Sequence, residues 1–91
     1  MVGKQMEKYY ILTFENTHSA INGETVLKEN KIKAIVMPTP TFVTKSCGIS
    51  LRISEEEIEK VKALIAEDKI KIKGSIVKEG NSFREVELIN N

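Results

Sequence analysis

Residues 48–65, GISLRISEEEIEKVKALI, change from a strand pattern to a helix pattern within one short stretch. In the first part every second residue is apolar, which is the period of a strand with one buried face: Ile49, Leu51 and Ile53. Further on, apolar residues recur every three or four positions, as in an amphipathic helix: Ile58, Val61, Leu64 and Ile65. Between the two sets, Ser54 followed by Glu57 predicts a capping box at the helix start. The stretch therefore predicts a strand that leads directly into a helix.

The same two patterns occur on the N-terminal side of this stretch. KYYILTF at residues 8–14 is short, aromatic and β-branched, and predicts a buried central strand. Asn16 or Thr17 can cap a following helix, whose small and apolar residues have helical spacing: Ala20, Gly23 and Leu27. IKAIVM at residues 32–37 predicts a second strand, which Pro38 and Pro40 end because proline has no N–H for the strand ladder.

The C-terminal side continues with KIKIKGSIV at residues 69–77, where lysine alternates with isoleucine and predicts a fourth strand with one wet face. Beyond it, a Gly-Asn turn and a weaker alternation leave three possibilities open: a fifth strand formed by a hairpin, pairing with another subunit, or a free tail. The order strand, helix, strand, strand, helix, strand predicts an α+β protein with the ferredoxin-like βαββαβ plait. In that fold two helices cover one face of an antiparallel four-stranded sheet.

The size of the chain predicts one domain, since 91 residues bury too little surface to divide further. We expect a flexible N-terminus at residues 1–7, the domain at 8–78 and a C-terminal extension at 79–91. Lys and Arg number 14 against 13 Asp and Glu, so the net charge of +1 gives no basic footprint for nucleic acid. The sequence contains neither a long apolar run nor the apolar centre of a signal peptide, which favours a cytoplasmic protein without membrane partners.

The stretch TKSCGISLR at residues 44–52 contains the only cysteine, Cys47. In the predicted topology the third strand begins beside the end of the first strand, so Cys47 should lie near the first turn of the first helix, which carries His18. The positive end of that helix, His18 and Lys45 would favour the reactive thiolate, and Gly48 would leave room for an incoming group. A lone cysteine can also simply fill a core, and His18 can simply bond locally within its helix turn.

A single cysteine excludes an internal disulfide and a four-cysteine zinc site within one subunit. The sequence also contains no phosphate-binding loop, no hydrolase triad and no metal-binding spacing. No cofactor and no metal are therefore expected.

Three stretches together, YYILTFENTHSA at 9–20, MPTP at 37–40 and SCGISLR at 46–52, resemble the small single-domain proteins of the selenium/sulfur (Se/S) carrier protein-like family. The resemblance extends roughly from Tyr9 to Val77, and the tail after Lys78 is not part of the family pattern. It implies that Cys47 holds sulfur or selenium as a persulfide or selenopersulfide. The cargo would come from a donor such as a cysteine desulfurase and pass to an acceptor enzyme, so the resemblance implies a carrier more than a stand-alone enzyme.

An alternative function remains open on the same fold. A ferredoxin-like domain can be a non-catalytic module that binds a small molecule for regulation or that mediates protein interactions. The sheet face without helices could also support a homodimer. The two functions differ in their dependence on Cys47, which only the carrier requires.

Overall fold

The computed structural model describes residues 8–43, 47–86 and 88. The N-terminal residues 1–7, expected to be flexible, and Lys45 lie outside this part of the chain. The fold is α+β, with two α-helices, one short 3-10 helix and five strands. The elements in chain order are β1 (Lys8–Thr13), α1 (Thr17–Glu29), β2 (Ala34–Pro38), β3 (Ile49–Ser54), η1 (Glu55–Glu57), α2 (Ile58–Ala66), β4 (Gly74–Glu79) and β5 (Ser82–Val86).

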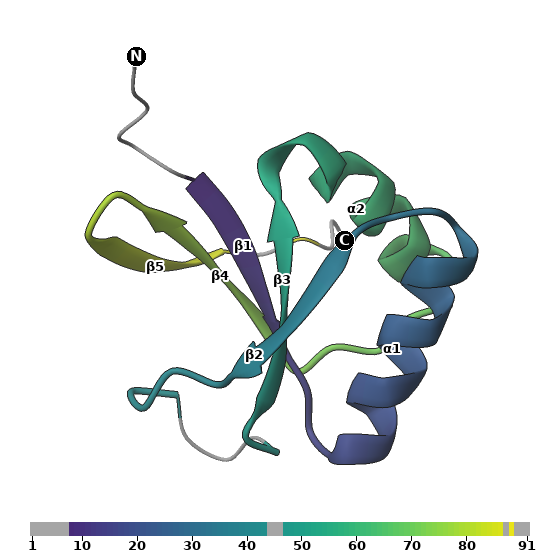
Figure 1. Ribbon diagram of the computed structural model, residues 1–91, viewed down its shortest axis with the longest axis horizontal. Coiled ribbons are helices and arrows are strands. Elements are labelled where there is room, and N and C mark those ends of the chain that lie inside the picture. Colours follow the sequence, from purple (N-terminus) through teal and green to yellow (C-terminus); the bar gives the residue numbers. More distant parts are fainter. Residues whose placement is uncertain (1–7, 44–46, 87, 89–91) are drawn as a thin grey trace.

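The five strands form one sheet in the order β2-β3-β1-β4-β5, and every neighbouring pair is antiparallel. The sheet thus has five strands instead of the four predicted. β1 lies in its centre, where Ile11 is paired with Arg52 of β3 on one side and Ile76 of β4 on the other. Figure 1 shows α1 and α2 together on one side of this sheet.

The hydrophobic core lies between the sheet and the two helices. Its sheet side chains alternate along the central strands, as the sequence predicts, and include Leu12, Leu51 and Ile53, all fully buried. Gly23 of α1 faces Phe14, the buried residue after β1. A Cβ atom at Gly23 would lie 3.1 Å from the Phe14 ring, so the glycine permits the close approach of helix and sheet that its position predicts.

The predicted alternatives for the C-terminal residues are resolved in favour of a hairpin. β5 pairs with β4 through the two-residue turn Gly80–Asn81, in which Gly80 has a φ of +59°. Leu88 is buried in the core and Val86 packs against it. The Ser75 hydroxyl also donates a hydrogen bond of 2.7 Å to the Val86 carbonyl oxygen.

Two local predictions are wrong. Residues 69–73 form no strand. Ile70, the first of their alternating isoleucines, is buried in the core beside α1 instead of in a strand. β4 begins only at Gly74 and is an interior strand, so it needs no lysines to protect an edge. The capping box is also absent, since the Ser54 side chain makes no capping hydrogen bond and a 3-10 turn precedes α2.

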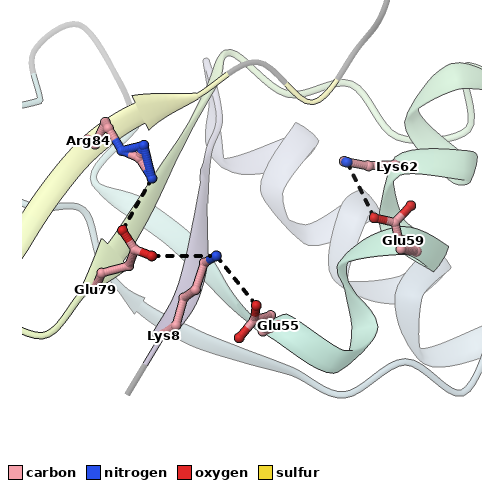
Figure 2. Close-up of polar contacts among 6 residues, drawn as sticks. All are labelled: Lys8, Glu55, Glu59, Lys62, Glu79 and Arg84. Carbon is pink, nitrogen blue, oxygen red and sulfur yellow. Dashed lines mark hydrogen bonds and ion pairs between the residues drawn. The ribbon is translucent and has the colours of Figure 1, made fainter. Parts of the chain in front are cut away.

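A small ion-pair network joins four elements near the start of β1: β1, η1, β4 and β5. Lys8 Nζ lies 3.4 Å from a carboxylate oxygen of Glu55 and 3.5 Å from one of Glu79, and Arg84 of β5 lies 3.2 Å from the other Glu79 oxygen (Figure 2). The pKa of Lys8 is raised above its ordinary value, first by the electrostatic interaction with Tyr10, then by the hydrogen bond and charge of Glu55, with the charge of Glu79 adding less.

Among the helices of the described residues, none is both long enough and apolar enough to cross a membrane.

Candidate functional site

Cys47 lies at the end of the sheet where α1 begins. Its backbone N–H donates a hydrogen bond of 3.1 Å to the carbonyl oxygen of Phe14, the residue directly after β1. Three residues after Phe14, Thr17 starts α1, whose N-cap Asn16 accepts a hydrogen bond of 2.8 Å from the Ser19 N–H. This placement follows from the antiparallel pairing of β1 with β3, in which Thr13 is opposite Ser50.

The sulfur of Cys47 is directed toward the helix side of the sheet. The side chain is half-buried and packs against the hydrophobic core. Its S–H donates a hydrogen bond to the Ile49 carbonyl oxygen at 3.3 Å. A thiolate has no proton for this contact, so a reaction at sulfur requires the side chain to leave the Ile49 oxygen first.

Gly48 leaves the space next to the cysteine open. Its φ is +87°, a conformation that favours glycine. Among the described residues, leaving aside its neighbours Cys47 and Ile49, no heavy atom lies within 4 Å of the place where a Cβ would stand. The Gly48 carbonyl oxygen accepts a hydrogen bond of 2.9 Å from the Thr39 N–H, which extends the β2–β3 ladder by one step. The backbone beside Cys47 is therefore held, while the described residues leave the Cβ position of Gly48 open.

The predicted activating groups are placed less directly. His18 lies in the first turn of α1, on the same end of the molecule as Cys47, and its side chain is exposed. Among the described residues no hydrogen bond or ion pair joins His18 to Cys47. Lys45 lies outside the described residues. Cys47 and Gly48 are consecutive in the chain, and the roles of all four residues, Cys47, Gly48, His18 and Lys45, stay predictions.

Metal binding is not suggested by the described ranges 8–43, 47–86 and 88. Within them, no three side chains of His, Cys, Asp or Glu are grouped so that they could hold a metal ion.

Two contacts around the segment before Cys47 were not predicted from the sequence. The hydroxyls of Thr39 and Ser50 share a hydrogen bond at 2.6 Å. The ring of Phe42 lies 5.2 Å, between centroids, from the ring of Phe83 in β5. The contact between Thr39 and Ser50 could be predicted once the β2–β3 register is known, since Thr39 follows β2 directly. The second joins two segments far apart in the chain, and no local pattern indicates it.

Residues 9–77 match the family described as "Putative Se/S carrier protein-like". This span contains Cys47, all of β2 and β3 and most of β1 and β4, and β5 lies beyond it. No curated protein and no solved structure matches the chain. Because the matched residues make up most of the sequence, the chain belongs to the Se/S carrier protein-like family.

Proposed function

We propose that this protein carries sulfur or selenium on Cys47 as a persulfide or selenopersulfide, between a donor such as a cysteine desulfurase and an acceptor enzyme. One observation supports this most: the only cysteine of the chain lies within the family span, half-buried at the end of the sheet and next to open space at Gly48. A cysteine that merely fills a core would not need a neighbour that leaves its approach free.

In each transfer step one thiolate replaces another at the transferred sulfur, so no external oxidant or reductant is needed. The Cys47 thiolate attacks the outer sulfur of a donor persulfide, R–S–SH. The Cys47–sulfur bond forms, the donor S–S bond breaks, and the donor cysteine leaves as a thiolate, so that Cys47–S–SH carries the proton. An acceptor nucleophile then attacks the outer sulfur and releases the Cys47 thiolate. A donor selenopersulfide, R–S–SeH, reacts in the same way.

The residues around the sulfur have separate tasks in this proposal. Gly48 gives the donor access, because it has no side chain beside the reacting atom. His18 and Lys45, with the N-terminal end of α1, favour the thiolate form of Cys47. His18 is suited to this by its place in the first turn of α1, the helix that starts three residues after the backbone partner of Cys47. The absence of a second cysteine prevents discharge as an internal disulfide.

We assign the fold to the ferredoxin-like plait, because its first four strands lie in the order β2-β3-β1-β4. β5 is added at the β4 edge. The domain would then comprise residues 8–78, with residues 79–91 as the extension that contributes β5. A cytoplasmic setting would keep the single thiol reduced and available.

The carrier proposal is tested by loading the protein with a cysteine desulfurase and free cysteine. Intact mass spectrometry should show the addition of one sulfur atom, located on Cys47 by peptide analysis. Cys47→Ser, the matched control, should stay unmodified. If the natural protein also stays unmodified while a known sulfur carrier is loaded in parallel, the proposal is wrong.

A small-molecule-binding regulatory module is the second candidate function. It is favoured by a hollow near the end of β1, lined by Thr13, Val43, Ile76 and Glu85 among others. Binding there would raise the melting temperature of the protein. The same rise in Cys47→Ser, without any sulfur loading of the natural protein, would favour this module over the carrier.

A further inference from the structure

The segment Thr39–Val43, called here the 39–43 segment, connects β2 to the region of Cys47 and reaches across the sheet. β2 and β5 are the two edges of the sheet, yet Phe42 lies against Phe83 of β5, with ring centroids 5.2 Å apart and the planes tilted by 59°. Val43 lines the same hollow as Ile76 and Glu85. In Figure 1 the chain leaves β2 toward the side of the view on which β4 and β5 lie.

The face on which this contact lies follows from the strand register. Phe83 is paired with Lys78, and Lys78 with Tyr9, so these three side chains share one face. The core residue Leu12 belongs to the other set of alternating side chains. The 39–43 segment therefore reaches Phe83 on the sheet face away from the helices.

The base of the 39–43 segment is bonded directly beside the cysteine. Thr39 donates its N–H to the Gly48 carbonyl oxygen at 2.9 Å and shares a hydrogen bond with Ser50. The Val43 N–H closes a turn on the Pro40 carbonyl oxygen at 3.0 Å. The segment is thus a short, internally bonded arm, with its base next to Cys47 and its tip against β5.

The contact at the tip comes from outside the family span. Phe83 belongs to β5, which begins after the last matched residue, Val77. Phe42 and Phe83 both stay partly exposed, at 56% and 44%, so neither ring is held by the core. The Phe42 and Phe83 rings contact each other, and Lys78 Nζ lies 5.8 Å from the centroid of the Phe83 ring.

We propose that Phe83 is a positioning residue, which holds the 39–43 segment on the sheet and thereby steadies the Thr39–Gly48 hydrogen bond, which controls how easily the Cys47 sulfur becomes accessible. Losing the ring contact would free the tip of the arm. The Thr39–Gly48 hydrogen bond at its base would then break more often, and Cys47 would leave its contact with the Ile49 oxygen more easily. The functional meaning of this control rests on the proposed carrier function.

Alkylation of Cys47 by iodoacetamide, followed by intact mass, tests the proposal without any sulfur donor. Phe83→Ala should speed alkylation about two- to tenfold, the factor that corresponds to the energy of one aromatic pair. Phe42→Ala should speed it equally, and the double variant no further, because either substitution removes the same contact. Hydrogen exchange of the Thr39 amide should accelerate in parallel.

Two control variants separate this effect from general loosening of the fold. Phe83→Tyr keeps the ring and should restore the natural rate. Ile35→Ala removes a similarly exposed apolar side chain from β2, at the opposite edge, and should leave the rate unchanged. Rates are compared at a temperature at which circular dichroism shows each variant folded. If Phe83→Ala does not fold, Phe42→Ala carries the test, since Phe42 lies outside the strands.

Unchanged alkylation in folded Phe83→Ala and Phe42→Ala, or independent effects that multiply in the double variant, would overturn the proposal. The result is distinguishable from failure of the carrier function. If the natural protein accepts sulfur but alkylation ignores Phe83, only the positioning role is lost. If alkylation responds as expected but no sulfur is accepted, the carrier function is lost and the control of access by Phe83 stands.

Discussion

Gly48 combines a special backbone conformation with open space at its Cβ position, and the two effects can be separated by substitution. Its φ is +87°, and a Cβ here would meet no heavy atom within 4 Å from the described residues beyond Cys47 and Ile49. We expect Gly48→Ala to lower the free energy of unfolding by about 1 kcal/mol, because an L-residue is strained in this conformation. Urea denaturation measures the change.

The matched variant for this prediction is Gly48→Asn. Asparagine adopts positive φ more readily than alanine, so it should cost less stability although its side chain is larger. The reverse order, with asparagine costing more than alanine, would mean that space and not backbone strain governs the position.

At this scale the sequence located the cysteine but not the state of its sulfur. The position of Cys47 beside Phe14 follows from strand order alone, which the hydrophobic alternation revealed. The direction of the thiol was not predicted, because Cys47 precedes the alternating set of β3, and only the structure shows it packed against the core. The hydrogen bond from sulfur to the Ile49 oxygen was not predicted either, because it depends on a side-chain torsion that sequence patterns do not encode.

Lys8 of β1 forms ion pairs with Glu55 of η1 and Glu79 of β4. The stability that these ion pairs contribute should therefore depend on pH. The folded protein raises the pKa of Lys8 above its ordinary value of 10.5, so the charged form is favoured by folding. Its stabilising contribution is complete below that ordinary value and is lost as the pH rises through the raised pKa. We expect Lys8→Met to be less stable than the natural protein at neutral pH and equally stable at pH values above that raised pKa.

Urea denaturation at several pH values checks this expectation, and Lys62→Met is a suitable control. Lys62 lies 3.4 Å from Glu59 on the exposed surface of α2, and within the described part of the chain this is its only ion pair (Figure 2). Its removal should therefore have little effect at any pH. A stability difference for Lys8→Met that persists unchanged at high pH would show that packing of the lysine stem is responsible, and not its charge.

The elements also show where local patterns succeed and where they fail. β1, β3 and the buried positions of α1 were predictable, because a strong periodic pattern coincides there with the true core face. Residues 69–73 have a strand-like alternation but form no strand, since pairing needs a neighbouring chain segment that the pattern cannot supply. Ile70 reaches the core from this irregular segment, where it approaches Gly23 of α1.

At the scale of the whole molecule, the C-terminal residues close the structure in two ways. β5 covers the edge of β4, which would otherwise present unpaired backbone groups. Val86 and Leu88 complete the core on the helix side, while Phe83 contacts Phe42 on the opposite face. The sequence left the hairpin as one of three alternatives, because the alternation after Gly80 is short and its pairing partner is determined only by the finished sheet.

The extension should therefore contribute to the stability of the whole domain. Leu88 is only 8% exposed and belongs to the core, so we expect Leu88→Ala to lower the free energy of unfolding by about 2–4 kcal/mol. A chain that ends at Lys78 should lose more, because it also lacks Val86 and the β4–β5 hydrogen bonds. Glu85→Ala, at an exposed position of β5, should change stability by less than about 0.5 kcal/mol.

Urea denaturation of these variants decides whether the hairpin is an integral part of the fold or an appendage. Cooperative unfolding, at a midpoint that falls in the order Glu85→Ala, Leu88→Ala, shortened chain, is the result that integration requires. A shortened chain as stable as the full one would show that the first four strands and two helices suffice. In that case the hairpin would position the 39–43 segment through Phe83 without contributing to the stability of the domain. The rate of Cys47 alkylation in the shortened chain should then rise as in Phe83→Ala, while the free energy of unfolding of the shortened chain stays equal to that of the full chain.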